Sequence, residues 1–73
     1  MRLNAEQSLA DNLKALNKKR VSVHLRGGSV LAGVVGDVGE HFVRIEELDQ
    51  KEFFDALVRL SDITALEARA RSS

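Results

Sequence analysis

The sequence has no cysteine, tryptophan, tyrosine or proline. Without cysteine the chain forms no disulfide and offers no thiolate to a metal ion. The two histidines, His24 and His41, cannot complete a structural zinc site by themselves, so we expect no metal and no cofactor. The sequence also has no glycine-rich phosphate loop, nucleophile elbow or metal motif. We therefore expect a protein that is not an enzyme.

An excess of one charge is also missing, because eleven basic side chains balance eleven acidic ones. A monomeric nucleic-acid binder is usually basic, but an oligomer can concentrate a few local positive charges on one face. No apolar run approaches the roughly 20 residues of a membrane span, and the N-terminus lacks the apolar core of a signal peptide. The expectation is a cytoplasmic protein that has no membrane partner.

With 73 residues the chain has room for a single domain, residues 1–73. A domain of this size buries only about 60% of its unfolded surface. Small domains gain further stability from disulfides, metals or oligomerisation. Since the first two are not expected here, self-association is the route that remains.

The N-terminal region has the pattern of an amphipathic helix. Asn4 and Gln7 have the spacing of a capping box. Leucines then follow at i, i+4 and i+7, which places them on one stripe of a helix. The prediction is a helix over about residues 5–19, which is too short to be stable alone and must dock on the rest of the chain. The stripe consists of Leu9, Leu13 and Leu16.

The remaining sequence favours short strands joined by turns. Gly27 and Gly28 suit a tight hairpin turn, whereas Gly33 and Gly36 inside a strand indicate a bend or a close backbone approach. Residues 52–68 also suit a helix, but strands are preferred there because helix would leave the preceding strands with open edges. The predicted strands are about 21–26, 29–37, 41–47, 52–59 and 63–67.

Several motifs, in order, resemble the Sm/LSm superfamily and most closely its bacterial branch, the Hfq family of RNA chaperones. The matching segments are Gln7-Ser8-Leu9-Ala10-Asp11, Ala15-Leu16 followed by a basic cluster and Val21, Leu31-x-Gly33, and His41-Phe42-Val43. The resemblance implies a mainly β fold: an SH3-like barrel of five bent antiparallel strands with one N-terminal helix. It also implies a homo-oligomeric ring, usually a hexamer in the bacterial branch and a heptamer in the other.

The sequence departs from that family where RNA is held. The bacterial segment Tyr-Lys-His-Ala-Ile-Ser aligns with residues 59–64, where Leu60 and Ser61 replace the Lys-His pair. The family's adenine-stacking tyrosine is His24, and a base-reading glutamine is Ala32. The Arg-Gly pair of the archaeal and eukaryotic branch is missing. Gln7 and Phe42 are kept, so the resemblance implies a divergent Sm-like protein with an altered pocket.

Each candidate site residue also has a structural interpretation. Phe42 can stack a base or simply pack, and Gln7 can contact a base edge or cap the helix. The basic triplet of residues 18–20 can hold RNA backbone or serve as a solvated helix end. Histidines such as these are usually surface residues, although His41 occupies a base-contacting position of the family. The candidate RNA-binding residues are Gln7, Lys18, Lys19, Arg20, His24, His41 and Phe42.

Three functions remain open at this point. The first is a ring that binds single-stranded RNA, rich in uridine or adenine, as an RNA chaperone does. The second is a ring that serves as a scaffold for protein partners without binding RNA, which the zero net charge and the acidic segment 46–55 favour. The third is a small barrel that is monomeric when isolated.

Overall fold

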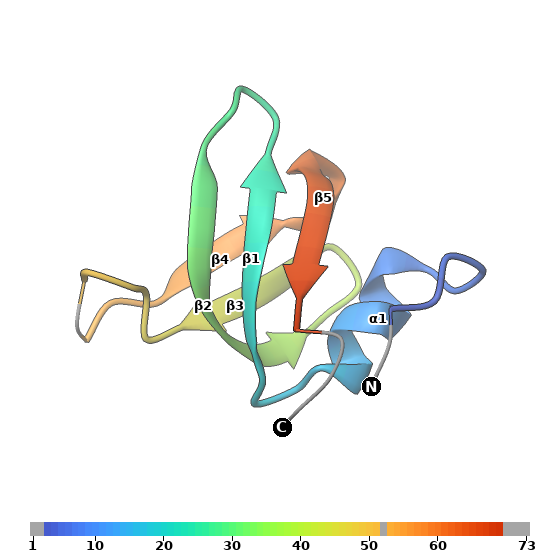
Figure 1. Cartoon of the computed structure of the whole chain (residues 1–73), viewed down its shortest axis with the longest axis horizontal. Coiled ribbons are helices and arrows are strands. Elements are labelled where there is room, and N and C mark those ends of the chain that lie inside the picture. The colour runs from blue at the N-terminus through green and yellow to red at the C-terminus, as the bar shows by residue number, and fades with distance from the viewer. Residues whose placement is uncertain (1–2, 52, 70–73) are drawn as a thin grey trace.

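The computed structural model describes residues 3–51 and 53–69, which form one short helix and a five-stranded sheet (Figure 1). All strand pairs are antiparallel, and the sheet order is β4-β3-β2-β1-β5. The prediction of a mainly β fold with an N-terminal helix is therefore confirmed. The elements are α1 (Leu9–Ala15), β1 (Arg20–Leu25), β2 (Val30–Val38), β3 (Phe42–Glu46), β4 (Ala56–Arg59), the 3-10 turn η1 (Leu60–Asp62) and β5 (Ile63–Ala68).

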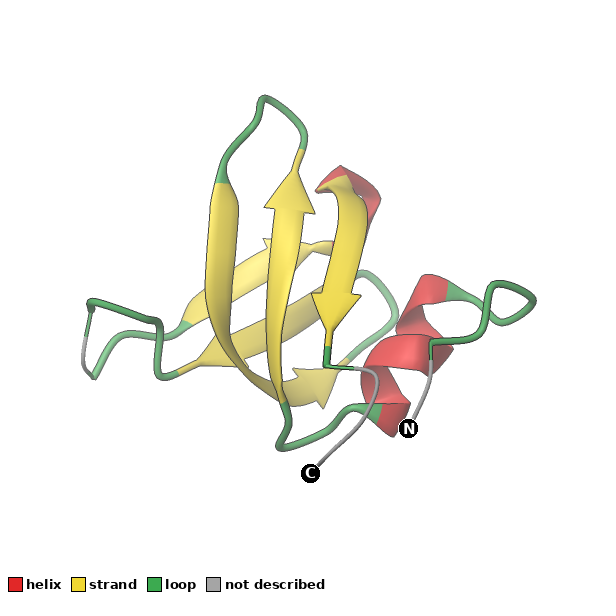
Figure 2. Cartoon of the chain, viewed as in Figure 1, coloured by secondary structure: helices red, strands yellow, loops and turns green. Residues whose placement is uncertain are grey.

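The long second strand bends the sheet on itself. One part of β2 pairs with β1 and the other with β3, so that β3 and β4 cross behind β1, β2 and β5 (Figure 2). Gly33 is buried at this bend, where an added Cβ would lie 2.5 Å from the carbonyl oxygen of Glu46. Gly36 is also buried, against the side chains of Glu46 and Arg44. The predicted close backbone approach at these glycines is thus confirmed.

The hydrophobic core lies inside the bent sheet and under α1. Alternate residues of the strands point inward, as period-two patterning requires. The leucine stripe of the helix closes one side: Leu13 and Leu16 are buried, and Leu9 packs against the core. The buried residues are Leu13, Leu16, Val21, Val23, Val35, Val43, Ile45, Leu48 and Val58.

The helix is shorter than the predicted span of about 5–19, and its cap is a different residue. Ser8 is the N-cap, where its hydroxyl accepts a hydrogen bond from the backbone N–H of Asp11 at 3.0 Å. Asn4 instead forms a turn before the helix, in which its carbonyl oxygen accepts from the N–H of Gln7. The predicted capping box of Asn4 and Gln7 is therefore wrong, because Ser8 offers the same chemistry directly before the leucine stripe.

Pairing with β2 also ends the helix early. Lys18 takes a left-handed backbone conformation (φ 68°), and its N–H donates to the carbonyl oxygen of Val35 at 2.8 Å. The N–H of Val35 in turn donates to the carbonyl oxygen of Lys19. The basic triplet therefore lies in the turn and at the start of β1, not in the last turn of a helix as predicted.

The fourth strand begins at Ala56 and not near residue 52, which itself lies outside the described residues. Backbone hydrogen bonds fold the preceding segment into a compact loop, with the N–H of Lys51 donating to Leu48 and that of Phe54 to Lys51. The helical alternative for residues 52–68 is wrong, since β4 and β5 occupy its described part. The other strand ends agree with the predicted ones to within one residue. No helix in the described part of the chain is long and apolar enough to cross a membrane.

Candidate nucleic-acid interface

Two turns that are far apart in the sequence meet beside Phe42. One is the turn between β2 and β3, and the other is η1 between β4 and β5. The N–H of Leu60 donates to the carbonyl oxygen of His41 at 2.8 Å, which fixes the turns together. Between them lies an open hollow of about 430 Å³, within the usual size range of small-ligand sites. It is lined by Glu40, His41, Phe42, Arg59, Leu60 and Ser61.

Phe42 supplies the aromatic surface of this hollow. Its neighbours on the strand, Val43 and Ile45, fill the core, while Phe42 points to the opposite face of β3 and leaves 42% of its surface exposed. An exposed ring of this kind is a platform on which a base can stack.

Arg59 is a residue of the hollow to which sequence reasoning gave no role. It is the direct partner of Phe42 across the β3–β4 pair, so both side chains lie on one face of the sheet. Arg59 is exposed, and none of the ion pairs between described residues involves it. Alternation along residues 56–59, with Val58 buried, is the sequence signal that places Arg59 outward.

His41 is brought to the hollow as the family pattern implied. Its side chain is exposed, and Nε2 lies 3.4 Å from Oε1 of the neighbouring Glu40. Ser61 adds a hydroxyl from the other turn. The hollow therefore combines an aromatic face, a guanidinium, an imidazole and a hydroxyl, with one carboxylate at its rim.

Gln7 does not line this hollow within one chain. It is exposed in the turn before α1, where its carbonyl oxygen accepts from Nδ2 of Asn12 at 3.4 Å. The side chain of Gln7 does not cap the helix, because Ser8 does so. The hollow and Gln7 are separate features of a single subunit.

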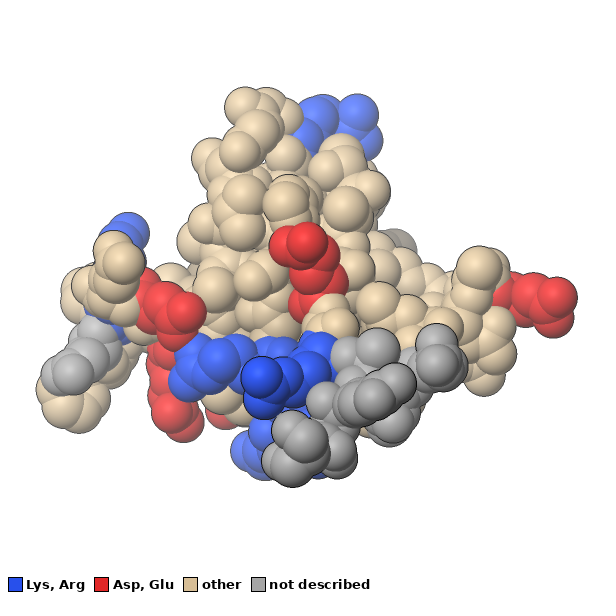
Figure 3. All heavy atoms as spheres, in the orientation of Figure 1, with Lys and Arg blue, Asp and Glu red and all other residues tan. Residues whose placement is uncertain are grey.

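The basic triplet is partly neutralised by acidic side chains. Arg20 forms an ion pair with Asp49, and Nζ of Lys18 lies 4.0 Å from Oε1 of Glu46. Lys19 takes part in none of the ion pairs between described residues. Figure 3 shows basic side chains gathered at the lower edge of the molecule, with acidic ones beside them. The triplet therefore presents less positive charge to a ligand than its sequence implies.

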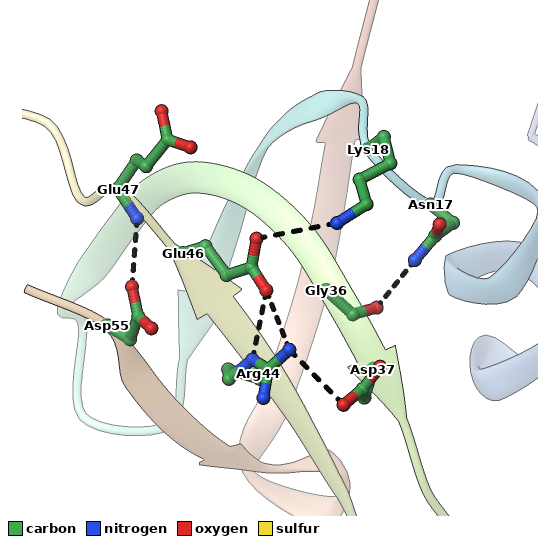
Figure 4. A network of polar contacts seen from close by, with 8 residues as sticks. All are labelled: Asn17, Lys18, Gly36, Asp37, Arg44, Glu46, Glu47 and Asp55. Atoms are coloured by element: carbon green, nitrogen blue, oxygen red, sulfur yellow. Dashed lines mark hydrogen bonds and ion pairs between the residues drawn. The ribbon is translucent and has the colours of Figure 1, made fainter.

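A network of polar contacts joins the turn after the helix to the sheet (Figure 4). Nδ2 of Asn17 donates to the carbonyl oxygen of Gly36 at 2.9 Å, and Lys18 lies beside Glu46. Glu46 accepts from Arg44 through Nε at 3.0 Å and Nη2 at 2.8 Å, and Arg44 also reaches Asp37 at 3.2 Å. The hydrogen bond that Arg44 donates to Glu46, and after it the charge of Asp37, raise the pKa of Arg44 above its usual value. Since each charge here is used inside the chain, this network does not form a binding site.

His24 lies on another face from the hollow. It is on β1 between Val30 of β2 and Ala65 of β5, and its Nε2 is 2.8 Å from Oε1 of Glu67. In the described part of the chain, no group of three or more histidine or carboxylate side chains is arranged to hold a metal ion. The structure thus separates the candidate residues into the Phe42 hollow, the basic turn and His24, with Gln7 apart from all three.

The architecture is that of an Sm fold. The crystal structure of an SmAP (LSm) protein from Methanococcus vannielii superposes on this chain with a TM-score of 0.70 at 24% sequence identity. The match covers 88% of this chain and 98% of that chain. No protein-family model matches the sequence, and no curated protein matches it either. The fold implied by the motifs is therefore confirmed by three-dimensional similarity, whereas the assignment to the bacterial branch remains a prediction.

Proposed function

We propose that this protein is a divergent Sm-like protein that assembles into a homo-oligomeric ring and binds single-stranded RNA, as RNA chaperones of the Hfq type do. The observation that carries the proposal is the junction of the two turns at the Phe42 hollow. An aromatic face and a cation that forms no ion pair with another described residue lie together there on one surface. Single-stranded RNA is recognised by just such stacking and backbone contacts.

Each residue of the hollow has a role in this proposal. Phe42 stacks a splayed base, and His41 with Ser61 contacts the edge of the base. Arg59 binds the phosphate, which the missing Lys-His pair would otherwise do. Gln7 approaches the RNA from the helix side. We propose uridine-rich or adenine-rich RNA as the ligand, with no catalytic step and with a cytoplasmic location.

The ring is supported by the two open edges of the sheet. β4 and β5 each pair on one side only within the chain, and the exposed backbone groups of such edges readily pair with another chain. Leu57 of β4 is 69% exposed and would be covered by a neighbouring subunit. Following the bacterial branch, we propose six subunits, with seven as the alternative.

In the proposed ring, Lys19 is the main cation of a basic rim. Lys18 and Arg20 add to this rim when RNA phosphates displace their acidic partners. These partners are Glu46 for Lys18 and Asp49 for Arg20. Because phosphate contacts dominate such binding, affinity should fall steeply with salt. His24, already paired with Glu67, is the weakest of the proposed contacts.

The test is a titration of labelled oligouridine and oligoadenine into the purified protein at low salt, with the mass of the same sample measured by light scattering. Since the chain has no tryptophan or tyrosine, refractive index gives the protein concentration. A ring that binds either RNA supports the proposal. A ring that binds neither would favour a scaffold for protein partners, which the neutralised Lys18 and Arg20 also favour. A monomer would exclude both.

A further inference from the structure

The loop between β3 and β4 exposes two phenylalanines at the end of the molecule opposite the helix (Figure 1). Phe53 is 98% exposed and Phe54 61% exposed. The two adjacent side chains are left largely uncovered by the rest of the described chain. Contiguous exposed apolar surface of this kind usually marks an interaction site.

Hydrogen bonds and an ion pair anchor the described part of this loop to the sheet. Leu48 is buried in the core, and its N–H donates to the carbonyl oxygen of Phe54 at 3.0 Å. The N–H of Asp49 donates to Ala32 on β2, and the Asp49 carboxylate pairs with Arg20. Because the described loop residues are already anchored, binding would cost little entropy for ordering them.

Phe53 is presented to solvent at an energetic cost. Its backbone is left-handed (φ 69°), a conformation that is unfavourable for a bulky residue. The phenyl ring of Phe53 therefore does not stabilise the turn, because the ring packs on little of the described chain and the residue disfavours this backbone conformation. Strain of this kind is found at sites of function.

A hollow of about 690 Å³ adjoins Phe53 and carries negative charge. It is lined by Arg20, Glu47, Leu48, Asp49, Gln50 and Phe53, so two carboxylates face one cation there. Glu47 enters none of the ion pairs between described residues, while Asp49 is neutralised by Arg20. The segment 46–55 has five acidic side chains and one basic one by sequence, and acidic side chains lie beside this loop at the left of Figure 3.

We propose that the Phe53 loop, defined as residues 47–51 and 53–55, is the docking site of a positively charged amphipathic segment of a protein partner. Apolar side chains of the partner would pack on Phe53 and Phe54, and its lysines or arginines would face Glu47 and Asp55. Complementary charge of this kind aligns partners and excludes acidic ones. The proposal is independent of RNA binding at the Phe42 hollow.

Charge argues against two other occupants. RNA would bring its phosphates to an acidic loop. A second copy that paired through β5 would bring the sequence Ile63–Ala68, whose one charged side chain is the acidic Glu67. Phe53 also precedes the first paired residue of β4, Ala56, so strand pairing alone would not cover it.

The test uses a short labelled synthetic peptide of leucine and lysine in amphipathic order, with fluorescence anisotropy as the readout. Phe53→Gly removes the ring and also relieves the left-handed backbone, so this variant should unfold at the same temperature or a higher one. We expect it to bind the peptide at least about tenfold more weakly, as is usual when an aromatic anchor is removed. Val30→Ser, which alters an exposed apolar residue at the other hairpin, is the matched control and should bind normally.

Further variants and peptides distinguish a basic protein partner from RNA or a second copy of the chain. Glu47→Gln should weaken binding several-fold, and a peptide with glutamate in place of lysine should not bind. Equal binding of the two peptides, or unchanged binding by Phe53→Gly, overturns the proposal. A smaller oligomer in Phe53→Gly would assign the loop to an interface between copies and also overturn it. Loss of oligouridine binding in Phe53→Gly would overturn the proposal too, because the loop would then be part of the RNA-binding surface.

Discussion

Phe42 of β3 and Arg59 of β4 face each other directly across an antiparallel strand pair. Cross-strand partners have their Cβ atoms about 4.5–5.5 Å apart, so an aromatic ring and a guanidinium share one small area of surface. A nucleotide has two matching groups, a flat base and a charged phosphate. In the proposed function, the pair would bind a nucleotide without the missing Lys-His pair.

Replacing Phe42 by alanine should weaken RNA binding without unfolding the protein. Loss of a stacking platform costs about 1–3 kcal/mol per base, which corresponds to a roughly fivefold to hundredfold loss of affinity. Anisotropy titrations with oligouridine and oligoadenine measure the loss. Val30→Ala is the control, because Val30 is also an exposed strand residue but lies away from the hollow. Equal affinities for the Phe42 variant and the parent would remove the stacking role.

Replacing Arg59 by glutamine should reduce the dependence of RNA binding on salt. Each phosphate that a protein cation binds on a single strand contributes about 0.7 to the slope of log K against log salt. The slope should therefore fall by about 0.7 for each Arg59 side chain of the assembly that had bound a phosphate. Lys51→Gln, in the loop before β4, should leave the slope unchanged. An unchanged slope for Arg59→Gln would mean that this guanidinium does not bind phosphate.

Asp49→Asn should strengthen RNA binding by freeing Arg20. The ion pair is exposed, and such pairs contribute up to about 1 kcal/mol, so the gain should be about twofold to fivefold. Asp37→Asn is the matched control, because it removes the same charge from the chain but releases Arg44, which Glu46 still holds. Equal gains in both variants would indicate a general charge effect and not a basic rim.

Gly33→Ala should destabilise the fold by about 1–3 kcal/mol, the usual cost of overpacking. The new Cβ would meet the backbone oxygen of Glu46 at 2.5 Å and Cγ2 of Ile45 at 2.8 Å, and backbone cannot move aside cheaply. Gly39→Ala is the control, since its Cβ would be 3.5 Å from the nearest atom, an ordinary contact. Urea unfolding followed by circular dichroism, repeated at several protein concentrations, measures both. Equal midpoints would show that β2 tolerates a side chain at its bend.

Local patterns in the sequence were sufficient for much of the fold. Leu13 and Leu16 were predicted from helical spacing, and Val21 and Val23 from alternation, because burial imposes those periods directly. The hairpin at Gly27 and Gly28 followed from backbone freedom alone, and both glycines have positive φ. The close approaches at Gly33 and Gly36 were also predictable, since only glycine lacks a Cβ.

Other features depend on contacts that no local pattern reveals. The helix ends early because β2 takes the backbone groups of Lys18 and Lys19. Arg20 is neutralised by Asp49, which is 29 positions away. The role proposed for Arg59 required the register of β3 against β4, because its distance from residue 42 along the chain says nothing about their pairing. Competition among tertiary partners, and not local propensity, decides each of these cases.

The sheet order β4-β3-β2-β1-β5 leaves two different free edges on the described chain, and the proposed ring would join one to the other. Assembly through such unlike surfaces is head-to-tail, and growth stops only when a ring closes. A subunit with a blocked β5 edge and an intact β4 edge could still join a growing assembly. No further subunit could then bind to its blocked edge. Small amounts of that copy would inhibit assembly of the normal protein, so a defect in one edge would act dominantly in a mixed population.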